Sequence, residues 1–70
     1  MKLSARNQFK GTVVEIQDGA VNGIVKLDIG GGNIISSTIS MNAIQELGLA
    51  VGKEAYAVVK ATSVMIGIDE

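Results

Sequence analysis

The sequence lacks cysteine, histidine, proline and tryptophan altogether in its 70 residues. Without cysteine the chain can form no disulfide. Without cysteine and histidine it lacks the ligands of zinc and copper sites, the nucleophile of thiol chemistry and the base of histidine-dependent triads. Aromatic residues are nearly absent too, since Phe9 and Tyr56 are the only two. We therefore predict a binding protein rather than an enzyme, and we expect no site for a metal cation.

The sequence also has no excess of charge of one sign, because six Lys and Arg residues face seven Asp and Glu residues. A formal charge of −1 produces no long-range field that would attract nucleic acid or an acidic membrane, although it allows a local basic pocket. No run approaches the roughly 20 consecutive apolar residues that span a bilayer, and the N-terminal residues lack the apolar segment of a secretion signal. We expect a cytoplasmic protein that binds neither nucleic acid nor membrane.

Apolar residues make up 47% of the chain, which is high for so small a protein. Domains of this size bury only roughly 60% of the surface that their unfolded chain exposes, so aliphatic side chains beyond one core remain at the surface. A second copy of the chain is the simplest cover for them. We expect one domain over residues 1–70 and an obligate homo-oligomer.

Most of the apolar residues alternate with polar ones, at the period of a β-strand. In the first alternating run Val14 and Ile16 share one face. The dipeptide Asp18-Gly19 and the run Gly30–Asn33 indicate turns, and the second favours a short hairpin because glycine tolerates positive φ. A phosphate-binding loop is not supported there, because a strand-like run and not a helix follows. Strands are predicted over residues 9–17, 21–29, 34–39, 55–60 and 62–68.

The pattern changes to a helical one between the third and fourth strands. Met41, Ile44 and Leu47 lie three residues apart, the spacing of one helical face, and a glycine follows as a C-terminal stop. Two N-terminal caps remain open: Ser40, or Asn42 in a capping box with the glutamine three residues later, which would leave the Ser40 hydroxyl free. The order β-β-β-α-β-β predicts an all-β fold with one short helix, a five-stranded Greek-key barrel of the OB type.

Two polar segments carry hydrogen-bond donors and no carboxylate. Ser4–Gln8 has one arginine among neutral donors, and Lys60–Ser63 joins the last two predicted strands. Each segment alone fits a solvated arm or a lysine that reaches into water. Together they offer guanidinium, ammonium, hydroxyl and backbone N–H groups, which lack the negative ligands that a metal cation needs but suit an oxyanion.

These segments also resemble a known family. Ser4–Gly11 (SARNQFKG), Ile39-Ser40 ahead of a helix that ends in Glu46–Gly48, and Val59–Ile66 (VKATSVMI) are similar to the molbindins, small molybdenum-pterin-binding proteins, over essentially the whole chain. The resemblance implies an OB-type fold and a hexamer, a trimer of dimers, that stores molybdate or tungstate in sites between subunits. Molybdenum would be bound as an oxyanion and not as a cation, and no organic cofactor is predicted.

The resemblance also implies a set of oxyanion-binding residues. One subunit would contribute a serine hydroxyl, a backbone N–H and a guanidinium from its N-terminal arm. An ammonium and a backbone N–H would come from the junction of the last two strands, and a further hydroxyl would come from the residue before the helix, from a neighbouring chain. These residues are Ser4, Ala5, Arg6, Ser40, Lys60 and Ala61.

Two alternatives remain at this point. OB barrels also bind single-stranded nucleic acid, although stacking platforms need more aromatic side chains than this chain has. The domain could also serve as the ligand-sensing part of a larger regulator or transporter.

Overall fold

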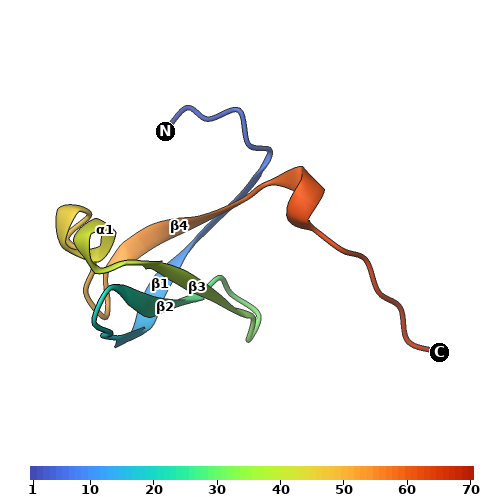
Figure 1. Ribbon diagram of the computed structural model, residues 1–70. Coiled ribbons are helices and arrows are strands. Elements are labelled where there is room, and N and C mark those ends of the chain that lie inside the picture. Colours follow the sequence, from blue (N-terminus) through green and yellow to red (C-terminus); the bar gives the residue numbers. More distant parts are fainter.

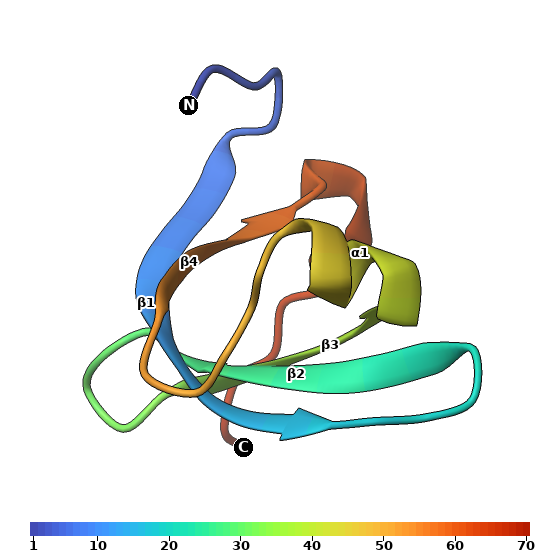
Figure 2. The same ribbon diagram turned by 90° about the vertical axis from the view of Figure 1, so that its left-hand side faces the viewer.

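The structure is a computed structural model that describes residues 1–70 and contains four strands, one α-helix and one 3-10 turn. The strands form a single antiparallel sheet in the order β3-β2-β1-β4. Figures 1 and 2 show that the sheet curls into a half-barrel, with the helix at one end. The predicted class, mostly β with one short helix, is confirmed. The elements are β1 (Asn7–Gln17), β2 (Asn22–Asp28), β3 (Ile34–Ser40), α1 (Met41–Glu46), β4 (Glu54–Val59) and η1 (Ala61–Ser63).

A β-bulge bends β1, the longest strand, near its middle. The pairing with β2 jumps from Val13 to Glu15, so that Val14 is an extra residue without a partner. Val13 is fully buried, Ile16 packs against the core, and Val14 is 43% exposed. The predicted common face of Val14 and Ile16 is therefore wrong, because the bulge shifts the alternation by one residue. The same irregularity increases the local twist that curls the sheet.

The glycine run between β2 and β3 forms the predicted hairpin turn. Gly30, Gly31 and Gly32 have φ angles of 100°, 63° and 79°. Residues with a Cβ rarely adopt these values. The Asp28 carboxylate accepts a hydrogen bond from the Gly30 N–H at 2.8 Å and holds the start of the turn.

The helix α1 closes one end of a small core. Its residue Ile44 is 6% exposed and lies directly against β2, where a Cβ on Gly23 would come within 2.7 Å of the Ile44 Cδ1 atom. Beyond the helix, Leu47 is the C-terminal cap and Gly48 has a φ of 61°, as the predicted stop requires. The helix is too short and too polar to cross a bilayer. The buried hydrophobic residues are Val13, Val25, Leu27 and Ile44.

The fifth strand predicted over residues 62–68 is not formed within the chain. After β4 the chain makes the turn η1 and runs on without backbone pairing, and Met65, Ile66 and Ile68 are 92%, 88% and 87% exposed. Figure 1 shows this C-terminal end leading away from the sheet. Alternating apolar residues form a strand only where they can pair with the edge of a sheet. In this chain they pair with neither edge strand. Both β3 and β4 are left as free edges.

Ile44→Ala should lower the free energy of unfolding by about 2–5 kcal/mol, because it opens a cavity where the helix meets the sheet. Val21→Ala is the matched control, since Val21 is 73% exposed and the change should cost less than about 0.5 kcal/mol. Urea denaturation at one fixed protein concentration measures both. Equal midpoints for the two variants would contradict this description of the core.

Candidate functional site

Arg6 and Lys60 come together at one end of the sheet. The last pair of the β1–β4 ladder is Asn7 with Val59, and Arg6 precedes the first of these residues while Lys60 follows the second. Both cationic side chains are exposed, and neither forms an ion pair: the two salt bridges of the molecule involve Lys10 with Glu54 and Lys26 with Glu15. The end of this ladder therefore presents two positive charges without a counter-charge.

Side-chain hydrogen bonds hold the backbone beside these cations. The Asn7 amide nitrogen donates to the Val59 carbonyl at 3.2 Å, and the Gln8 amide nitrogen donates to the Ala5 carbonyl at 2.8 Å. Asn7 thus ties β1 to β4 at the end of the ladder, and Gln8 turns the arm back on the start of β1. Sequence reasoning noted both residues only as donors and missed this positioning role, which depends on the pairing of two distant strands.

Backbone donors remain available on both sides of the cations. The Ala5 N–H donates to no group of the chain. The turn η1 makes its first internal hydrogen bond from the Ser63 N–H to the Lys60 carbonyl at 2.9 Å, so the turn does not use the Ala61 N–H. Ser4 is exposed on the same arm. The arm and the turn together supply a guanidinium, an ammonium, backbone N–H groups and a hydroxyl, and each of these can donate a hydrogen bond.

Ser40 lies elsewhere and has a structural role of its own. It is the N-cap of α1, and its Oγ accepts a hydrogen bond from the Ala43 N–H at 3.0 Å. Ser40 and not Asn42 therefore caps the helix. Because the cap uses only an oxygen lone pair, the hydroxyl proton can still be donated.

The sheet register separates Ser40 from Arg6 within one chain. Ser40 pairs with Asn22 at the start of β2, and the start of β2 runs beside the end of β1, where Gln17 pairs with Ile24. Arg6 precedes the opposite end of β1. A single chain thus brings together five of the six candidates predicted from the sequence. The sixth, Ser40, lies near the opposite end of β1.

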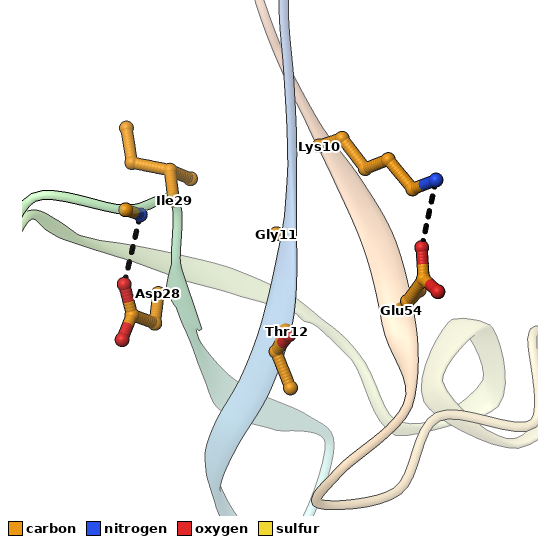
Figure 3. Close-up of a pocket in the computed structure, with 7 residues that line it drawn as sticks. Lys10, Gly11, Thr12, Asp28, Ile29 and Glu54 are labelled. Atoms are coloured by element: carbon orange, nitrogen blue, oxygen red, sulfur yellow. Dashed lines mark hydrogen bonds and ion pairs between the residues drawn. The ribbon is translucent and has the colours of Figure 1, made fainter.

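A hollow on the exposed face of the sheet is chemically different. Figure 3 shows Lys10, Thr12, Asp28 and Glu54 around this space, which has a volume of about 440 Å³. The Lys10 ammonium lies 2.8 Å from a Glu54 carboxylate oxygen. The hydrogen bond to Glu54 raises the pKa of Lys10, as does the electrostatic influence of Glu54 and Tyr56. With its cation paired and a second carboxylate present, the hollow would repel an anion.

Comparisons with known proteins give matches that cover nearly the whole chain. A TOBE domain model matches residues 3–66. A probable molybdenum-pterin-binding protein from Haemophilus influenzae is 65% identical over 69 residues, which cover 99% of this chain and 100% of that protein. The structure of MopII from Clostridium pasteurianum matches with a TM-score of 0.90 and 51% identity, covering 96% of this chain and 100% of the other. The chain belongs to the molbindins.

A third match concerns a longer protein. The structure of the cytoplasmic molybdate-binding protein ModG, solved with molybdate bound, has a TM-score of 0.82 and 49% identity to this chain. The match covers 87% of this molbindin and 43% of ModG. The likeness to these structures includes the OB-type fold, which the half-barrel with one helix represents here.

Ser40 offers a test of the helix cap that involves no ligand. Ser40→Ala should lower the free energy of unfolding of this molbindin by about 1 kcal/mol, because the Ala43 N–H loses its acceptor. Ser40→Asp should keep the stability, since aspartate caps helices as well as serine does. Urea denaturation of the three proteins distinguishes these outcomes, and an alanine variant as stable as the aspartate variant would exclude the cap.

Proposed function

We propose that this molbindin binds molybdate, or the related oxyanion tungstate, at sites built between subunits of a homo-oligomer, and that it stores the anion without catalysing a reaction. One observation carries the proposal. The end of the β1–β4 ladder places Arg6 and Lys60 next to each other with no carboxylate to neutralise them.

The charges of the site match those of its proposed ligand. Molybdate and tungstate are dianions, and a buried charge without compensation costs several kcal/mol. Arg6 and Lys60 supply two positive charges. A guanidinium can form two parallel hydrogen bonds to one tetrahedral anion, while an ammonium acts as a point charge.

The neutral donors complete the coordination of the anion. The Ser4 hydroxyl and the N–H groups of Ala5 and Ala61 lie on the same arm and turn as the two cations. A tetrahedral oxyanion has four oxygens that accept hydrogen bonds. A site made only of donors can direct a hydrogen at each of these oxygens. The same set offers no oxygen ligand with negative charge to a metal cation.

The position of Ser40 supports a site shared between subunits. Its hydroxyl lies at the far end of β1 from Arg6, so it reaches the anion only from another copy of the chain. The exposed apolar side chains support self-association as well, since residues such as Leu47, Val51 and Tyr56 are 67%, 65% and 49% exposed. We assign the oligomer as a hexamer built from three dimers.

The cytoplasm is the proposed compartment. The related protein ModG is described as cytoplasmic, and the chain has no cysteine that an oxidising compartment would pair. Storage as the role follows from a site that holds an anion by charge and hydrogen bonds, with no nucleophile or base among its proposed ligands.

Arg6→Ala and Lys60→Ala should each weaken molybdate binding by at least ~1.5 kcal/mol, which is roughly a tenfold rise in the dissociation constant, through the loss of a charge-assisted hydrogen bond. Isothermal titration calorimetry measures the affinity. Lys10→Ala is the matched control, because it removes one positive charge that Glu54 already neutralises. Unchanged affinity in both site variants would reject the proposed site.

Native mass spectrometry should show a hexamer that retains oxyanions, and molybdate should raise the melting temperature because it binds only the folded assembly. The comparison is made at constant protein concentration with and without added molybdate. A stable monomer, with or without the anion, would contradict the shared site.

A further inference from the structure

Two backbone carbonyls next to the proposed oxyanion site accept hydrogen bonds from side-chain amides. The Ala5 carbonyl accepts from the Gln8 Nε2 atom at 2.8 Å, and the Val59 carbonyl accepts from the Asn7 Nδ2 atom at 3.2 Å. Each carbonyl belongs to the residue that directly precedes one of the two proposed cationic ligands. The side-chain amides therefore occupy acceptors at a place where the site needs donors.

The turn η1 engages its carbonyls as well. The Lys60 carbonyl accepts from the Ser63 N–H at 2.9 Å, and the Ala61 carbonyl accepts from the Val64 N–H at 3.3 Å. The oxygen of Ser40 likewise accepts a hydrogen bond from the first turn of α1. Five acceptors beside the proposed ligands are thus already in use.

Occupied acceptors matter because tetrahedral dianions differ in whether they carry a proton. In mildly alkaline solution molybdate, tungstate and selenate carry none, whereas phosphate and arsenate keep one O–H group. Where that O–H group meets only donors, the ligand proton has no acceptor and one donor of the site stays unpaired. A site whose nearby acceptors are occupied therefore discriminates against an oxyanion that carries a proton.

The Ala5 carbonyl depends on Gln8 alone for its partner. No backbone N–H donates to this carbonyl, so the Gln8 side chain makes its one hydrogen bond within the chain. The position is critical because the N–H of the same residue is a proposed ligand. In a trans peptide the C=O and N–H groups point in opposite directions, so the Ser4 carbonyl faces away from an anion that the Ala5 N–H binds. The Ala5 carbonyl belongs to the next peptide and is free to turn toward the anion.

We propose that Gln8 is a specificity-determining residue of the oxyanion site: by occupying the Ala5 carbonyl, it makes the site select fully deprotonated oxyanions over oxyanions that carry a proton. The inference rests on the proposed function and adds the class of ligand that the site rejects. The Ser4 hydroxyl does not remove this discrimination. To accept the proton of the ligand it must turn its own proton away, and an oxygen of the anion then loses its donor.

Selenate and arsenate are a matched pair of probes for this discrimination. In mildly alkaline solution both are tetrahedral dianions of similar size, and arsenate alone carries a proton. Calorimetric titration of the full chain, in competition with molybdate, measures the affinity for each probe. The native protein should bind selenate roughly tenfold or more tightly than arsenate, because the arsenate proton finds no free acceptor. Equal affinities for the two probes would contradict the proposal.

Two variants of Gln8 test its part in the selection. Gln8→Met frees the Ala5 carbonyl and should improve the affinity for arsenate relative to selenate by about fivefold or more. Gln8→Glu should shift the ratio in the same direction while weakening both probes, since a carboxylate repels both dianions and itself offers an acceptor. Asn33→Leu is the matched control and should keep the native ratio. It removes a similar bond, from a side-chain amide to the Gly30 carbonyl three residues earlier at 3.1 Å, in the turn between β2 and β3.

The outcomes separate the selection from the proposed function. A native ratio of selenate to arsenate affinity in both Gln8 variants would overturn the selection, although molybdate binding would leave the function intact. An equal loss of molybdate, selenate and arsenate in Gln8→Met, with the circular dichroism of the sheet retained, would overturn it too, because that result assigns Gln8 a purely structural role. A native protein that binds no molybdate would reject the proposed function, and the selection with it.

Discussion

The antiparallel pairing of β1 with β4 is the interaction on which the rest of the molecule depends. It joins the first strand of the chain to the last one, over the ladder from Asn7 with Val59 to Thr12 with Glu54. The segments that flank this ladder in the sequence, the N-terminal arm and the turn η1, carry the cations Arg6 and Lys60. A contact between residues 52 positions apart thereby places two cations without an ion-pair partner at one end of the sheet.

The small core explains why the molecule leaves so much apolar surface uncovered. Four hydrophobic residues are buried, and burial of an aliphatic side chain contributes roughly 1.5–3 kcal/mol. The β-bulge at Val14 bends β1 so that the sheet begins to close, but four strands leave β3 and β4 unpaired. The half-barrel is thus a fold that leaves its core open between its two edge strands.

The cations at the end of the β1–β4 ladder differ from two other cations of the sheet. Lys10 and Lys26 each have a carboxylate partner and form solvated pairs, which contribute little to stability. At the end of the β1–β4 ladder the cations have no partner. Ser40 also keeps a free donor, because its oxygen caps α1 while its hydroxyl proton can still be donated.

Periodicity and local chemistry in the sequence determined most of the elements. They predicted the first four strands, the glycine turn and the helix before Gly48, since each depends on neighbouring residues. The resemblance in Ser4–Gly11 and Val59–Ile66 indicated the family, which the comparisons confirm. The donor composition of two short segments indicated an oxyanion, because residue type alone decides whether a group gives or accepts a hydrogen bond.

The tertiary structure decided what depends on distant partners. The bulge at Val14 arises from the pairing with β2 and reverses the expected face, and the choice of Ser40 over Asn42 as the cap depends on where β3 ends. The proximity of Arg6 to Lys60 and the separation of both from Ser40 follow from strand order and register. The alternating residues 64–68 are the clearest case: their pattern predicts a strand, but a strand needs an edge to pair with, and in the folded chain these residues pair with none.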